Sequence, residues 1–204
     1  MSRWYDVISG PFGQKYTDAG LQQLAPQPGE KALEIGYGTG YALVSLAKAV
    51  GQSGKVHGID ISDKMKEIAQ HRVRKAGLLE QVELVRGDAT KLPYAENFFD
   101  LIHMSFTLEL FPDKLIPVLL QECRRVLRPG GRLGVVAMSN KSKPTWMLRL
   151  YNWSHKAFPA YVDCRPIFAA KLIEQAGFAI INDKEMNMWG LPVTVIAAQN
   201  PEGL

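Results

Sequence analysis

Leu33-Glu34-Ile35-Gly36-Tyr37-Gly38-Thr39-Gly40 joins a short apolar run to a helical pattern through a glycine-rich turn. The run Lys31–Ile35 is typical of a buried strand, and Tyr41–Val50 repeats apolar residues at helical spacing. Glycines in such a turn allow a tight bend and let a ligand approach the backbone closely. Taken alone, the turn has two interpretations, a ligand-binding loop and a purely structural one.

The alternation of strand-like and helical patterns continues along the whole chain. Further strand-like runs are expected at 55–60, 82–85, 99–106 and 132–138. Helices are expected from the Ser62 cap to Gly77 and over 115–127, 145–158 and 166–176. Two β-type runs at 178–188 and 191–199 indicate a closing antiparallel hairpin. Repeated strand–helix–strand units predict an α/β domain, a parallel sheet with helices on both faces, formed by residues 1–204 as a single unit.

Two carboxylates follow the second and third predicted strands. Asp60 closes the run 55–60, and Asp88 stands in Gly87-Asp88-Ala89. Because the carboxyl ends of parallel strands share one sheet edge, both should border the same ligand site as the glycine turn. There Asp60 would accept hydrogen bonds from a ribose diol and Asp88 one from an adenine amino group. The other interpretation of Asp60, a helix N-terminal cap, is weaker because Ser62 already supplies that cap.

These stretches resemble the motifs of class I S-adenosylmethionine-dependent methyltransferases. The matching segments, in order, are 33–40, 58–62, 87–93, 98–102 and 127–133. The similarity is closest to the branch with the ubiquinone/menaquinone C-methyltransferases and bacterial phosphatidylethanolamine N-methyltransferases. The resemblance implies a Rossmann-like fold of seven strands, six parallel and one antiparallel, and S-adenosyl-L-methionine as the cofactor.

The resemblance and the pattern together give a set of expected cofactor-binding residues. They are Tyr5, Tyr16, Glu34, Gly36, Tyr37, Gly38, Gly40, Asp60, Ile61, Met65, Gly87, Asp88, Ala89, Ser105 and Phe106. Glu34 is expected near the methionine amino group through solvent. Tyr37 departs from the family pattern, which has a small residue or Cys there. Its ring is expected to pack over the methionine part of the cofactor or to narrow the substrate entrance.

Two other functions compete with methyl transfer. An NAD(P)-dependent oxidoreductase would need a third small residue in GxGxxG or GxGxxA, but Tyr41 or Leu43 stands there. A non-catalytic S-adenosylmethionine-binding subunit would keep the same motifs, so only an activity assay distinguishes it from an enzyme.

No residue is unmistakably catalytic, but three are candidates: Glu109, His155 and Tyr161. Glu109 has two interpretations, a ligand of the substrate or a proton acceptor, and a carboxylate favoured at a helix start. His103 alternates with inward-facing strand residues and is expected to be a packed core histidine.

The acceptor is expected to be a small lipophilic or aromatic molecule, such as a quinone precursor or a phospholipid head group. Residues 141–171 mix aromatic and basic side chains, which suits an amphipathic lid over an apolar pocket, and 144–158 also suits contact with an anionic membrane surface. Residues 1–28 are expected to form a second lid segment over the cofactor.

The composition sets the remaining expectations. The net charge of +4 is scattered along the 204 residues, which does not favour a nucleic acid partner. Cys123 and Cys164 have neither disulfide nor metal-ligand spacing, so we expect no metal, a buried Cys123 thiol and a cytoplasmic location, with peripheral membrane contact as an additional possibility. No run approaches the ~20 apolar residues of a membrane span. The oligomeric state stays open.

Overall fold

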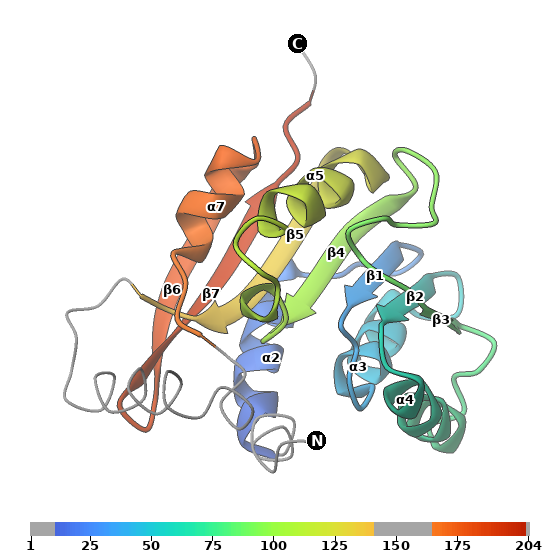
Figure 1. The fold of residues 1–204 in the computed structure, drawn as a ribbon. Helices are drawn as coiled ribbons and strands as arrows, with labels where there is room; N and C mark the ends of the chain where they lie inside the picture. Colours follow the sequence, from blue (N-terminus) through green and yellow to red (C-terminus); the bar gives the residue numbers. More distant parts are fainter. Residues whose placement is uncertain (1–10, 141–164, 203–204) are drawn as a thin grey trace.

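A seven-stranded sheet organises the computed structural model, which describes residues 11–140 and 165–202 (Figure 1). The strands are β1 (Lys31–Ile35), β2 (Lys55–Asp60), β3 (Val82–Arg86), β4 (Phe99–Ser105), β5 (Leu127–Met138), β6 (Ala179–Met188) and β7 (Leu191–Gln199). Their order is β3-β2-β1-β4-β5-β7-β6. β7 is antiparallel to both of its neighbours, and the other pairs are parallel. This confirms the predicted six parallel strands, single antiparallel strand and closing hairpin.

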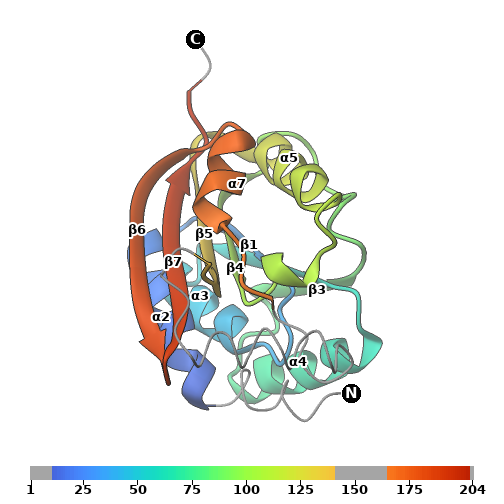
Figure 2. The same cartoon turned by 60° about the vertical axis from the view of Figure 1, so that its left-hand side comes forward.

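Helices cover both faces of the sheet (Figures 1 and 2). One face carries α2 (Pro11–Leu24), α3 (Tyr41–Val50) and α4 (Asp63–Lys75), and the other carries α5 (Ile116–Val126) and α7 (Ala169–Gln175). Along β1 the buried side chains alternate between the two cores, with Leu33 and Ile35 on the α5 side and Ala32 on the α3 side. β1, β2 and β4 are therefore buried over most of their length, whereas the edge strand β3 is only partly buried. Cys123 of α5 is buried, as expected.

Two predicted boundaries were wrong, at the start of α7 and at the start of β5. The helix expected over 166–176 begins only at Ala169, because the Ile167 N–H donates to Met138 O and Ile167 O accepts from the Asn140 N–H. Backbone used in this short parallel bridge cannot also form a helical turn. β5 itself begins at Leu127 rather than at 132, because Leu127 already pairs with Phe99. The helix expected over 145–158 lies outside the described residues.

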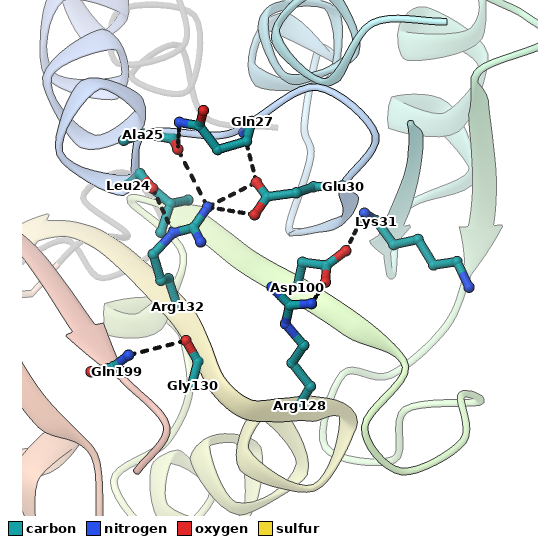
Figure 3. A network of polar contacts seen from close by, with 10 residues as sticks. All are labelled: Leu24, Ala25, Gln27, Glu30, Lys31, Asp100, Arg128, Gly130, Arg132 and Gln199. Carbon is teal, nitrogen blue, oxygen red and sulfur yellow. Dashed lines mark hydrogen bonds and ion pairs between the residues drawn. The ribbon is translucent and has the colours of Figure 1, made fainter. Parts of the chain in front are cut away.

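The C-terminal end of α2 is fastened to β5 through one arginine (Figure 3). Arg132 Nε donates to Leu24 O at 2.9 Å, and its Nη2 reaches Ala25 O and both carboxylate oxygens of Glu30. The last carbonyls of a helix have no partner within the helix, so a guanidinium in this place supplies the missing donors. Arg132 thereby sets where α2 crosses the sheet.

Replacing Arg132 by Ala should lower the free energy of unfolding by about 2 kcal/mol, since several charge-assisted hydrogen bonds of a mostly buried guanidinium are lost. Arg128→Ala is the matched control, because the Arg128 side chain is half exposed and forms a single ion pair within the described ranges, with Asp100 at 2.7 Å. That variant should lose about 0.5 kcal/mol. Urea unfolding of both variants measures the difference, and equal losses would contradict the role given to Arg132.

Candidate functional site

A cavity of about 620 Å³ opens at the carboxyl ends of the parallel strands. Most of the expected cofactor-binding residues line it: Glu34, Gly36, Tyr37, Gly38, Asp60, Ile61, Met65, Gly87, Asp88, Ala89, Ser105 and Phe106. A parallel α/β sheet places ligands outside these strand ends, and a volume of this size suits a small-molecule ligand. The sheet therefore brings together residues that lie up to 72 positions apart, from Glu34 to Phe106.

The turn after β1 needs glycine at Gly36 for two reasons. Its φ of +69° lies in the left-handed region, and a Cβ there would collide with the Thr107 side chain. The Gly36 N–H donates to Ile59 O at 2.8 Å, which ties the turn to β2. Gly40 also has a left-handed backbone but is not part of the cavity wall, and it serves as the residue before α3.

The Asp60 carboxylate is fixed by backbone donors from two separate turns. Its Oδ2 accepts from the Gly38 N–H and its Oδ1 from the Ser62 N–H, each at 2.9 Å. Ser62 Oγ accepts from the Met65 N–H, so Ser62 caps α4 as expected. Asp60 is only 8% exposed, and each oxygen keeps a lone pair for a hydroxyl in the cavity. The carboxylate is thus oriented before any ligand arrives.

Asp88 lies at the neighbouring strand end in an exposed position. Its Oδ1 accepts from the Thr90 N–H at 2.9 Å and from the Thr90 hydroxyl at 2.8 Å. This local turn fixes the Asp88 side chain through Oδ1, and Oδ2 takes no part in the turn. The arrangement leaves one oxygen of Asp88 for a polar donor in the cavity.

Glu34 is paired with His103 below the cavity. Glu34 Oε2 lies 2.7 Å from His103 Nδ1, and the two side chains are 2% and 0% exposed. Burial raises the pKa of Glu34, and the nearby His103 opposes that rise. The expectation of a core histidine is confirmed for its burial, and the structure adds its bond to a cavity-lining carboxylate.

The Tyr37 ring turns toward the core while it borders the cavity. It packs with Leu43 and Leu84 in the place that the missing side chain of Gly58 leaves open. The hydroxyl is buried and has no hydrogen-bond partner within the described ranges, and burial raises the pKa of Tyr37. Its apolar ring therefore shapes the wall beside β2.

The carboxyl end of β4 is joined to α2 at the cavity. Ser105 Oγ and Thr17 Oγ1 share a hydrogen bond at 2.9 Å, and Phe106 adopts a left-handed φ of +52°. Tyr16 packs edge-on against Phe106 and donates to Asn187 O at 2.8 Å. Tyr16 is thus a support behind Phe106 rather than part of the cavity wall, which departs from the expectation.

Glu109 lies in the first turn of the short helix η1 (Leu108–Leu110), as one of its two interpretations expects, and its side chain has a further structural role. Its carboxyl group is 1% exposed, lies outside the cavity wall and accepts the Met138 N–H at 3.0 Å through Oε1. β4 has already ended at Ser105, so this side chain satisfies a backbone donor that the strand pairing leaves open. Burial raises the pKa of Glu109 to about 7.

Several cavity residues had no signal in the sequence. They are Gly13, Gln14 and Thr17 of α2, and Thr107, Leu110, Phe111, Pro112 and Leu115 of the loop after β4. The aromatic residues of 1–28 stand out in the sequence, whereas the small and polar residues on this face of α2 do not. Tyr5, His155, Tyr161 and most of 141–171 lie outside the described residues.

Residues 11–140 and 165–202 lack two features, a metal-ligating cluster and a membrane-spanning helix. No cluster of three or more His, Cys, Asp or Glu side chains suited to a metal ion is found in these ranges. In the same ranges, no helix has the length and apolar character needed to cross a membrane.

Comparison with known proteins gave a family match and several relatives. The model of the ubiE/COQ5 methyltransferase family matches residues 3–171. A demethylmenaquinone methyltransferase of Staphylococcus aureus is 39% identical over 157 residues, 74% of this chain and 63% of that protein. One of Bacillus velezensis is 38% identical over 127 residues, 62% of this chain and 53% of that protein. The chain thus spans little more than half the length of the curated relatives it matches.

Solved structures show the same fold at low sequence identity. A SAM-dependent methyltransferase from Aquifex aeolicus gives a TM-score of 0.73 at 22% identity and covers 96% of both chains. The [4+2]-cyclase SpnF gives 0.76 at 21% identity, with 93% of this chain and 82% of that one covered. Because a methyltransferase and a cyclase share this fold, the fold alone does not determine the reaction.

The buried Glu109 carboxyl group should make stability depend on pH. Its pKa is about 7 in the folded protein and 4.5 when unperturbed, so the folded state keeps a proton that the unfolded chain has lost. Its contribution is therefore fully present below pH 4.5 and is lost as the pH rises to about 7, by up to about 3 kcal/mol. Glu109→Gln, which keeps the acceptor for Met138, should flatten urea-unfolding stability across this window.

Glu174→Gln serves as the control for that experiment, because Glu174 is an exposed carboxylate on α7. It should leave the pH profile of the wild-type protein unchanged. A Glu109→Gln profile that still falls between pH 4.5 and 7 as the wild type does would show that another group titrates.

Proposed function

Because the chain belongs to the ubiE/COQ5 methyltransferase family, we propose that it transfers a methyl group from S-adenosylmethionine to a lipophilic aromatic acceptor of the quinone-precursor type. The observation that carries the proposal is a single cavity lined by two kinds of residues. Fixed carboxylates and a glycine turn come from the ends of β1, β2 and β3, and apolar side chains come from the segment after β4. S-adenosylmethionine supplies an activated methyl group and the protein supplies orientation.

The strand order gives a direction for the cofactor in the cavity. Asp88 follows β3, Asp60 follows β2 and Glu34 lies on β1, and these strands are adjacent in that order. An adenine amino group at Asp88 and a ribose diol at Asp60 would place the methionine end near Glu34 and Ser105. The residues present fit the cofactor, since a carboxylate lies along this line for the adenine amino group, for the ribose diol and for the methionine ammonium group.

The apolar part of the cavity supports a lipophilic acceptor. Leu110, Phe111 and Leu115 line it and come from the loop and helix that follow β4. An aromatic ring buried there would lose water and gain contacts with these side chains. The curated relatives named above carry the name demethylmenaquinone methyltransferase, which favours a quinone precursor over a phospholipid head group.

Methyl transfer to a ring carbon requires a base, because the new carbon–carbon bond leaves the ring with a proton to lose. We retain His155 and Tyr161 as candidates for this base on the sequence alone. Glu109, which lies outside the cavity wall, would act only through residues it positions. Contact of 144–158 with a membrane surface also stays a proposal, and it would bring the protein to a lipophilic acceptor.

Calorimetric titration of S-adenosylhomocysteine tests the cofactor assignment. The wild-type protein should bind it with micromolar affinity, and Asp60→Ala should weaken binding at least about tenfold, or about 1.4 kcal/mol. Asp63→Ala is the matched control, since this nearby carboxylate is exposed and pairs with Arg86. Binding of NAD in preference to S-adenosylhomocysteine would overturn the assignment.

A methyl-transfer assay with radiolabelled S-adenosylmethionine tests the acceptor. We expect label in demethylmenaquinol and none in phosphatidylethanolamine. Label in the phospholipid alone would replace the quinone precursor by the head group as acceptor. Cofactor binding without transfer to any acceptor tried would favour the non-catalytic subunit.

A further inference from the structure

A histidine that does not line the cavity is bonded to a carboxylate that does. Glu34 and His103 are direct neighbours in the parallel pairing of β1 and β4, so their side chains project on the same face of the sheet. The 2.7 Å contact joins Glu34 Oε2 to His103 Nδ1. Only Glu34 belongs to the cavity wall, and His103 lies behind it.

The surroundings of His103 determine which of its nitrogens carries the proton. Nδ1 faces a carboxylate oxygen, which only accepts, so Nδ1 is the donor. Nε2 is buried and has no hydrogen-bond partner among the residues the structure describes. The geometry therefore assigns the Nδ1 hydrogen to the bond with Glu34.

Helix α2 closes the space around this imidazole. A Cβ added to Gly20 would lie 3.1 Å from His103 Nε2 and would clash with Val136, so only glycine lets the helix approach this closely. Water is thereby kept from the far side of the ring. Among the residues that the structure describes, the His103 side chain has one hydrogen bond, and it is to Glu34.

The bond to His103 leaves the other oxygen of Glu34 for the cavity. Oε2 receives the imidazole proton, and within residues 11–140 and 165–202 no hydrogen bond to Oε1 is found. Burial alone would favour a neutral carboxyl group, and a hydrogen bond to the carboxylate opposes that tendency. An ionised Glu34 would attract an ammonium group in the cavity far better than a protonated one.

We infer that His103 is a positioning residue that keeps the Glu34 carboxylate ionised and oriented toward the methionine end of the cofactor. This inference rests on the proposed function, since it takes the ligand to be S-adenosylmethionine or its product. It concerns a residue that touches no ligand and acts only through Glu34.

Binding titrations with two ligands and four variants test the inference. His103→Leu removes the donor at similar volume, and His103→Asn keeps an N–H near the place of Nδ1. Glu34→Gln and the double variant His103→Leu/Glu34→Gln complete a double-mutant cycle. S-adenosylhomocysteine carries the methionine-derived ammonium group, and 5′-methylthioadenosine lacks it but keeps the adenosine part.

We expect His103→Leu to weaken binding of S-adenosylhomocysteine by about tenfold or more and His103→Asn to weaken it by less than about threefold. Binding of 5′-methylthioadenosine should change by less than about twofold in both, which also verifies that the variants are folded. In the Glu34→Gln background, His103→Leu should change the affinity for S-adenosylhomocysteine by less than about twofold, because residue 34 then carries no charge for His103 to orient.

Three results would overturn the inference. One is equal affinity of the wild type and His103→Leu for S-adenosylhomocysteine. Another is an equal loss for both ligands, which would make His103 a general packing residue. The third is an undiminished effect in the Glu34→Gln background. A wild-type protein that binds neither ligand would instead overturn the proposed function together with this inference.

Discussion

The parallel pairing of β3, β2, β1 and β4 is the constraint on which the site depends. It ends four strands at one edge, and the turns that follow must then satisfy their own backbone groups in a small space. Asp60 meets this requirement by accepting an N–H from the turn after β1 and another from the turn after β2. The carboxylate proposed to bind ribose is therefore also the link between two loops, so binding geometry and local folding are set by the same atoms.

Helix α2 completes the site from outside the strand–helix alternation. It is fastened at its end by Arg132, in its middle by the close approach of Gly20 to the sheet, and near the cavity by Thr17 and Ser105. These contacts connect the N-terminal helix to β4 and β5, which come more than 80 residues later in the chain. The cavity wall thus depends on the long-range packing of the domain, although its glycine turn is local.

The strands and the cofactor residues could be predicted where the signal is local. Lys31–Ile35 and the turn after it follow from a short apolar run and its glycines, and Asp60 and Asp88 follow from their places at strand ends. The Glu34–His103 pair could not be predicted, because it depends on the register between β1 and β4. The late start of α7 at Ala169 was missed because a backbone bridge, which has no residue preference, occupies Ile167. The bond from the Met138 N–H to Glu109 was missed for a related reason, since it joins a side chain to the main chain of a strand 29 positions away.

β5 extends past the end of β4, and this length difference has a consequence for how such a chain diversifies. At the unpaired edge, a Glu109 oxygen replaces the absent strand carbonyl and the Ile167 backbone replaces the absent N–H. The Asn140 N–H donates to Ile167 O, so the end of β5 is completed by groups on either side of the intervening segment. That segment can therefore be exchanged for another of different sequence or length while the sheet keeps its hydrogen bonds. Evolutionary change in that segment therefore need not disturb the sheet that carries the glycine turn, Asp60 and Asp88.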